Sequence, residues 1–78
     1  MKEYVYTIFN PMINMFLCDP DDPRDRWTMD EGDAFTIPSS MTLEEAENVL
    51  QGIIKGFEPT ERHFAQQLKD SHITQVEV

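Results

Sequence analysis

Thr42-Leu43-Glu44-Glu45 opens the stretch that decides the fold, because it begins the strongest local signal in the chain. A threonine followed three residues later by glutamate is a capping box: the threonine side chain bonds the backbone of Glu45, and the glutamate carboxylate reaches back. Acidic residues in a first helical turn also suit the helix dipole. Apolar residues then recur on one face at helical spacing, at Leu43, Ala46, Leu50, Ile53, Ile54 and Phe57. We therefore predict a helix over 43–55.

Glycines mark the far part of this helix. Gly56 is the expected stop, with Pro59 beyond it. Gly52 lies inside the helix, where glycine costs about 1 kcal/mol relative to alanine. We interpret Gly52 as a position that permits close packing of the helix on a sheet.

The chain before this helix predicts a hairpin. Residues 4–9 are β-branched and aromatic on both faces, which is typical of a strand covered on both sides. Asn10-Pro11 then starts a turn, and residues 15–18 form the returning strand. Asn14 is expected in the left-handed conformation that closes a bulged hairpin.

The middle of the chain is predicted to be irregular. Residues 19–26 form a loop, because its two prolines cannot donate hydrogen bonds to a sheet and its carboxylates repel one another. Three short elements are expected next: a strand over 27–29, a turn over 30–33 with Asp30 as its cap, and a strand over 34–37 ended by Pro38.

The chain after the first helix predicts a second helix over 60–70 and a strand over 72–78. Together these elements give one domain, 1–78, of the α+β class, with a small, mainly antiparallel sheet packed against one long and one shorter α-helix. The expected core is Val5, Phe9, Phe16, Trp27, Phe35, Leu43, Leu50, Ile53, Ile54, Phe64, Leu68 and Val76.

Acidity is the dominant compositional feature. Fifteen Asp and Glu against six Lys and Arg give a formal charge of −9 on 78 residues. Such a protein repels nucleic acid and anionic membranes and is attracted to basic surfaces. The single Cys18 excludes an internal disulfide and favours a reducing, cytoplasmic setting. No apolar run approaches the ~20 residues of a membrane-spanning helix.

Catalytic and metal-binding patterns are weak, so we expect no enzyme, no metal and no cofactor. Asp19-x-Asp21 resembles the start of a calcium loop, but Arg24 stands where that loop requires glycine. His63 and His72 fall on different predicted elements, whereas zinc needs denser ligation. Cys18 is expected to be buried and inert at a strand end.

Seven of the acidic residues crowd into one fifteen-residue stretch, and two interpretations of it stay open. They are Asp19, Asp21, Asp22, Asp25, Asp30, Glu31 and Asp33. In one interpretation the stretch is a solvated loop that keeps the protein soluble. In the other it docks into a basic groove, so that association is fast and salt-sensitive. Within this stretch, Arg26 is expected to stack on Trp27 or to pair with Asp25.

The hairpin turn is unusual because Met12 and Ile13 stand where turns normally place polar residues. Either the turn folds under a neighbouring element, or the two side chains are exposed as an apolar binding site. A polar turn would serve a plain hairpin better, which favours the exposed alternative.

The order of these segments resembles a group of short phage and mobile-element proteins. The resemblance rests on Tyr4-x-Tyr6-x-Ile8-x-Asn10-Pro11, Phe16-Leu17, Trp27-Thr28-x-Asp30, Ala34-Phe35 and Leu43-Glu44-Glu45-Ala46-Glu47. It spans residues 4–50 and 73–78, and the segment 60–70 looks like an insertion. It implies a hairpin, a tryptophan strand, an "EEAE" helix and a final strand. It also implies an origin, since small acidic phage proteins such as anti-CRISPR proteins bind and disable host machinery.

The expected function is therefore a non-enzymatic inhibitor of the phage anti-defence type, acting in the cytoplasm of a host cell. Its partner would be a basic host protein or nucleoprotein complex that handles nucleic acid, occluded sterically and electrostatically, with no direct binding of nucleic acid or membrane. The alternative is a small structural or assembly protein that acts as a homodimer or larger homo-oligomer. The expected partner-binding residues are the seven acids 19–33 together with Met12 and Ile13.

Overall fold

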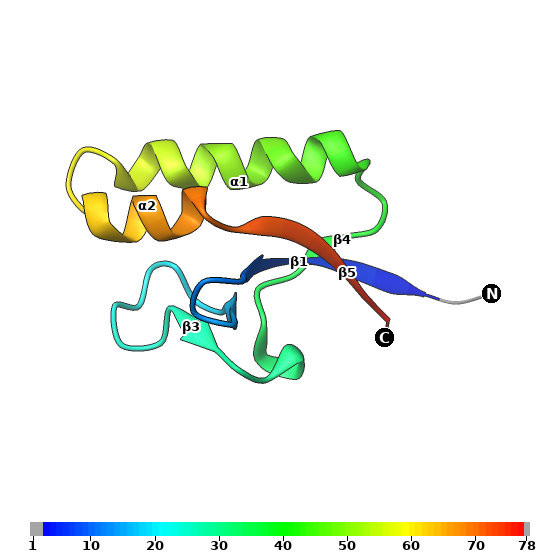
Figure 1. Cartoon of the computed structure of the whole chain (residues 1–78). Helices are drawn as coiled ribbons and strands as arrows, with labels where there is room; N and C mark the ends of the chain where they lie inside the picture. The colour runs from blue at the N-terminus through cyan, green and yellow to red at the C-terminus, as the bar shows by residue number, and fades with distance from the viewer. Residues whose placement is uncertain (1–2, 78) are drawn as a thin grey trace.

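The computed structural model describes residues 3–77 and shows one antiparallel sheet with two helices on one of its faces (Figure 1). The expected α+β class is confirmed. The elements are β1 (Tyr4–Asn10), β2 (Met15–Leu17), β3 (Trp27–Thr28), the 3₁₀ turn η1 (Glu31–Asp33), β4 (Ile37–Pro38), α1 (Leu43–Phe57), α2 (Arg62–Lys69) and β5 (His72–Glu77). Val78, the last residue of the strand expected over 72–78, lies outside the described residues.

The central strand of the sheet is β1, the longest apolar run of the N-terminal half. β5 pairs with it antiparallel along six residues on one side. On its other side β1 pairs with β2 near its C-terminal end, where Phe9 lies opposite Phe16, and with β4 near its N-terminal end, where Tyr6 lies opposite Ile37. β3 pairs with the outer edge of β2.

The core lies between the helices and the sheet face that is uppermost in Figure 1. Its buried members are Tyr6, Ile8, Leu17, Ile37, Ala46, Leu50, Ile54, Phe64 and Leu68. The expected burial of the α1 and α2 residues at 50, 54, 64 and 68 is confirmed. The expected burial of Val5 and Phe9 in this core is wrong, because β1 turns Tyr6 and Ile8 towards the helices instead. Both faces of β1 are apolar, so alternation along the strand does not distinguish them.

Helix α1 begins as its sequence predicts. The Thr42 hydroxyl accepts the Glu45 backbone N–H at 3.1 Å, and the Glu45 carboxylate accepts the Thr42 N–H at 3.0 Å. The helix does not stop at Gly56 but continues to Phe57, whose carbonyl accepts the N–H of Glu61 at 2.7 Å. Leu43, an expected core residue, is 51% exposed in the first turn.

Gly52 does not serve close packing, contrary to our expectation. A Cβ built at this position meets no atom within 4 Å, and the residue is exposed. The helix therefore bears the conformational cost of glycine without a contact that requires it.

The sheet face turned away from the helices, here called the lower face, carries Val5, Thr7, Phe9, Phe16, Thr28, His72, Thr74 and Val76, since directly opposite residues share a face. Segment 29–36 crosses below the sheet and covers part of this face (Figure 1). Thr7 is fully buried there, and its hydroxyl bonds that of Thr74 at 2.6 Å. The rest of the face is half-buried, except for His72, which is exposed, so β1 is not covered equally on both sides.

The strand expected over 34–37 is shifted. The Phe35 N–H donates to the Leu17 carbonyl at 2.8 Å, so this part of the chain runs past the end of β2. Only at Ile37 does the chain reach β1, and Pro38 is part of β4, opposite Val5. A proline is tolerated in β4 because this two-residue strand pairs only with β1.

Candidate binding surfaces

The β1–β2 turn is held by a buried asparagine at its start. The Asn10 side chain accepts the Met12 N–H at 2.8 Å and donates to the Gln67 carbonyl of α2 at 3.0 Å. Asn14 has a φ of 56°, the left-handed conformation expected for the residue that closes the turn. The turn is thus fixed to the body of the protein while Met12 is 77% exposed and Ile13 36% exposed. Both side chains are therefore exposed and do not fold under a neighbouring element.

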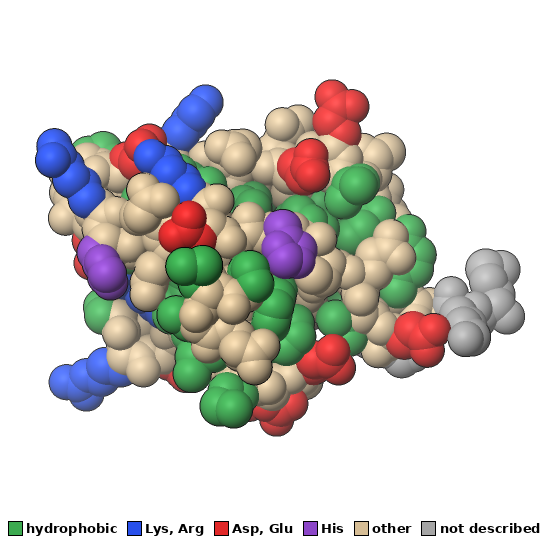
Figure 2. Space-filling model, viewed as in Figure 1, with side chains coloured by type: hydrophobic (Ala, Val, Ile, Leu, Met, Phe, Trp, Pro, Cys, Tyr) green, Lys and Arg blue, Asp and Glu red, His purple; other side chains and the backbone are tan. Residues whose placement is uncertain are grey.

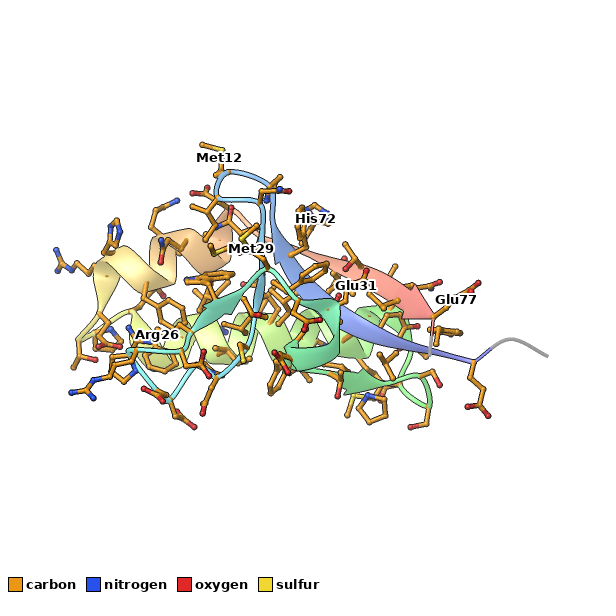
Figure 3. The ribbon with its side chains drawn as sticks, turned by 90° about the horizontal axis from the view of Figure 1, so that it is seen from below. Met12, Arg26, Met29, Glu31, His72 and Glu77 are labelled. Carbon is orange, nitrogen blue, oxygen red and sulfur yellow. The ribbon has the colours of Figure 1, made fainter. Side chains whose placement is uncertain are left out.

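A third apolar side chain lies near the turn, directly after β3. Thr28 lies opposite Phe16, so the next residue, Met29, comes level with Met15 at the end of the turn. Met29 is 76% exposed. Figure 3, which looks at the lower face, shows Met12, Met29 and His72 around this end of the sheet. Met12, Ile13 and Met29 together are here called the hairpin-end patch. Met29 was not among the expected site residues, because its place depends on the β2–β3 register.

Beside the hairpin end, the lower face carries a row of aromatic side chains. The ring centroids of Phe9 and Phe16 are 5.0 Å apart, and those of Phe9 and His72 are 5.9 Å apart. Phe9 and Phe16 remain half-buried. A solvated sheet face usually carries polar side chains, so this row is an apolar surface that is only partly covered.

The acidic loop 19–26 is ordered by its own carboxylates. The Asp19 side chain accepts the Asp21 N–H and the Asp22 side chain accepts the Arg24 N–H, both at 3.0 Å. Backbone bonds close the loop at its base, from Cys18 N–H to the Arg26 carbonyl at 2.7 Å. Aspartates that bond the backbone two residues on are turn formers. Part of this acidity therefore serves the shape of the loop.

Three of the carboxylates surround Cys18. Its thiol donates to the Asp33 carbonyl at 3.0 Å. Partial burial, and then the charges of Asp25, Asp33 and Asp19, raise the pKa of the Cys18 thiol. Because the thiolate is the reactive form of cysteine, this environment disfavours the reactive form of Cys18. Cys18 is half-buried just beyond β2, close to the strand-end position that the sequence predicted.

The other acidic residues lie in two places. Asp21 and Asp22 are exposed in the loop, while Asp30 and Glu31 are exposed directly after Met29. Asp30 also caps η1 as expected, because its carboxylate accepts the Gly32 N–H at 2.9 Å. Within residues 3–77, none of the seven acids at 19–33 forms an ion pair. Their negative charge is therefore not neutralised inside the described part of the protein.

Arg26 turns away from this acidic surface. The predicted stacking on Trp27 and the predicted ion pair with Asp25 are therefore both wrong. Its guanidinium pairs with Glu61 and lies 4.1 Å from the centre of the Phe64 ring. The ion pair joins residues 35 positions apart, which no local pattern could reveal. Arg26 consequently ties the loop to the start of α2.

Within residues 3–77, no group of three or more His, Cys, Asp or Glu side chains is placed to hold a metal ion. His63 lies on α2 and His72 on β5, in agreement with their expected separation. None of the helices in the described part of the chain is long and apolar enough to cross a membrane. Comparisons with protein-family models, curated proteins and solved structures found no match.

Proposed function

We propose that this chain is a non-enzymatic binding protein that docks on a basic protein surface through the hairpin-end patch and the carboxylates beside it. The observation that carries the proposal is the exposure of Met12 and Met29, 77% and 76%, at one end of a sheet face that is only partly covered. Exposed apolar clusters mark interfaces. Methionine suits such a role because its flexible, polarisable side chain adapts to a partner.

The turn that carries Met12 is built as a rigid support. Its backbone is bonded to the buried Asn10, and Asn10 is bonded in turn to α2. A patch on a pre-ordered turn loses little conformational entropy when it binds, so more of the contact energy contributes to affinity.

Charge selects the partner. Asp30 and Glu31 follow Met29 directly, and neither has an ion pair among the described residues. A partner that presents an apolar pocket with Lys or Arg around it would contact the methionines and neutralise these carboxylates. Such complementarity raises association rates and excludes acidic partners.

The nature of the target is the finer part of the proposal. Basic surfaces of this kind are typical of proteins that handle nucleic acid. The resemblance to small acidic phage proteins supports the same class of target, host machinery that is disabled by occluding its nucleic-acid channel. In this mechanism one inhibitor binds one target and no covalent chemistry takes place.

The test is affinity capture from bacterial lysate at ~50 and ~200 mM salt, since screening weakens long-range attraction over this range. Four baits are compared: the natural chain, Met12→Ser with Met29→Ser, Glu31→Gln, and Leu43→Ser. Leu43 is the matched control, because it is an exposed apolar residue outside the patch. We expect a basic, nucleic-acid-handling protein that is retained at low salt, lost with the double methionine variant and kept with Leu43→Ser. Glu31→Gln should reduce its retention.

Two results would contradict the proposal. One is capture that the methionine variant leaves intact. The other is capture that Leu43→Ser reduces equally, which would mean that any exposed apolar residue suffices.

The alternative function, self-assembly, is favoured by one observation. β5 pairs with β1, and no other described strand pairs with the outer edge of its part 72–76. An unpaired edge is a template for another strand, and a second copy could pair there antiparallel. Sedimentation of the pure protein separates the two functions: a monomer supports the binding protein, and a concentration-dependent dimer supports assembly.

A further inference from the structure

The basic side chains of this acidic protein are gathered at one end. All five Lys and Arg within residues 3–77 belong to the acidic loop, the last turns of α1, or α2: Arg24, Arg26, Lys55, Arg62 and Lys69. Figure 2 shows Lys and Arg only at the end of the molecule where α1 meets α2 and the acidic loop lies below them, whereas Asp and Glu spread over the whole visible face. The cations of a chain of charge −9 are therefore concentrated at one end, beside the carboxylates of the acidic loop.

A cleft of about 580 Å³ opens at this end, between the loop and the start of α2. All three arginines of the chain line it, and it is here called the arginine cleft. Arg24 comes from the loop, and Arg62 and His63 come from the first turn of α2. Trp27 and Gln67 also line the cleft. The volume lies within the range of about 300–1,000 Å³ that is typical of small-ligand sites.

One of the arginines is already engaged by the protein. Arg26 pairs with Glu61, donates to the Pro20 carbonyl at 3.1 Å and packs on the Phe64 ring. Only 15% of its side chain is exposed. The Arg26–Glu61 pair is close to neutral and forms a fixed wall, so the net charge of the cleft comes from the other two arginines.

Arg24 and Arg62 are the available cations. Neither forms an ion pair within residues 3–77, and both side chains are exposed. Arg24 lies on the acidic loop. Its backbone N–H donates to the Asp22 side chain at 3.0 Å, which fixes the loop backbone at this position. Arg62 is carried by a helix. Two guanidinium groups are thus mounted on separate, ordered elements at one cleft.

Uncharged donors complete the cleft. The Gln67 side-chain oxygen accepts the Trp27 indole N–H at 3.3 Å, which leaves its amide NH₂ as a donor. Glu61 precedes α2 without capping it through its side chain. The first-turn N–H groups of a helix have no partner inside the helix, so they add to the donors at this end.

We propose that the arginine cleft binds the phosphate group of a small phosphate monoester. A single guanidinium fork satisfies both oxygens of a carboxylate, whereas a phosphate monoester presents three terminal oxygens and can engage two forks at once. The cleft presents two unpaired arginines from separate elements, with amide donors beside them. This arrangement matches a phosphate monoester, which can engage two guanidinium forks. The arginine cleft is distinct from the hairpin-end patch. Phosphate binding at the cleft can therefore be tested independently of the basic protein partner proposed for the patch.

The protein carries its own reporter, because the only tryptophan of the chain, Trp27, lines the cleft. The experiment titrates the full chain with inorganic phosphate, glycerol 3-phosphate and acetate at constant ionic strength. Binding is followed by Trp27 fluorescence and by the backbone amide resonances of Arg62 and His63. We expect saturable binding of both phosphates, and acetate at least about tenfold weaker, because it engages one guanidinium fork instead of two.

Arg24→Gln and Arg62→Gln should each weaken phosphate binding about tenfold, because each removes charge-assisted hydrogen bonds. Lys55→Gln is the matched control: it makes the same change in net charge but does not line the cleft, so binding should stay within about twofold. Thermal melting of each variant checks that the fold is intact. An equal loss with Lys55→Gln, acetate binding as tight as phosphate, or no saturable response overturns the proposal.

The two phosphates separate the possible sources of the ligand. Tighter binding of glycerol 3-phosphate than of inorganic phosphate means that the cleft also contacts the organic part of the ester, which supports the monoester as the ligand. Tighter binding of inorganic phosphate contradicts the ester and restricts the site to the free ion.

Discussion

The hairpin-end patch and the arginine cleft are built in opposite ways. In the patch, Met12 and Met29 are about three-quarters exposed, and the carboxylates that follow Met29 have no cationic partner in residues 3–77. In the cleft, Phe64 is buried beneath a guanidinium that is itself paired. Apolar groups that the fold does not bury are available to a partner. Arg26 is already paired within the fold and contributes to stability. Only Arg24 and Arg62 are therefore available to bind a ligand at the cleft.

The largest expected contrast is in stability. Phe64 is 3% exposed and packs edge-to-face on Phe57 and Trp27, at centroid distances of 5.0 and 6.0 Å. Phe64→Ala should cost about 3–5 kcal/mol, a large part of the stability of a small domain. Met29→Ala should change the free energy of unfolding by less than about 0.5 kcal/mol. Urea denaturation followed by circular dichroism measures both. Equal costs at the two positions would break the comparison.

The next effect distinguishes the arginines from one another. Arg26→Ala removes the bonds to Glu61 and Pro20 and the packing on Phe64, and should cost about 1–3 kcal/mol. The cost stays below that of a fully buried pair, because Glu61 is 37% exposed and water can replace its partner. Arg24→Ala should cost less than about 0.5 kcal/mol. If thermal melting shows that Arg24→Ala is as destabilising as Arg26→Ala, Arg24 is not free for a ligand.

A smaller change in stability is expected at the patch. Ile13→Asp places a charge on an exposed turn, so the free energy of unfolding should fall by less than about 1 kcal/mol. Binding of the partner should nevertheless be lost, because the desolvated centre of an interface does not tolerate a charge. Melting and affinity capture on the same preparation give both values. Loss of several kcal/mol with binding retained would place Ile13 in the core.

The smallest effect concerns protonation at the basic end. The hydrogen bond and charge of Lys69, 2.7 Å away, hold the pKa of Glu58 below its ordinary value, and Lys55 contributes less. A depressed folded pKa stabilises the fold above the ordinary carboxyl pKa, and this contribution is lost as pH falls through the folded value. Lys69→Ala should raise the pKa of Glu58 by more than Lys55→Ala does, as read by NMR titration of its carboxyl carbon. Equal shifts would mean that the ion pair does not persist in solution.

Local chemistry made several features predictable. The capping box at Thr42 and Glu45, the left-handed Asn14 and the Asp30 cap each depend on atoms a few residues apart. The exposure of Met12 and Ile13 was one of two alternatives that the sequence left open, because it also depends on whether a distant element covers the turn. The capping and turn geometries do not depend on distant segments of the chain. They can therefore be recognised from the sequence alone.

The sites were only partly predictable. The seven acids and the Met12-Ile13 turn were identified from the sequence, but Met29 joins them through the β2–β3 register. The arginine cleft was not expected at all. Its walls are brought together by contacts between residues 35 and 40 positions apart, from Arg26 to Glu61 and from Trp27 to Gln67.

By itself the sequence determined the acidity, the helix start, the turn and the α+β class, because charge, capping and spacing act within a few residues. Only the tertiary structure decided which face of β1 is buried. Val5 and Phe9 are as apolar as Tyr6 and Ile8, and the face is selected by where α1 and α2 pack. The same packing drew Arg26 away from the neighbouring aspartates, because a guanidinium gains more from a buried ring and a facing carboxylate than from charges already surrounded by water.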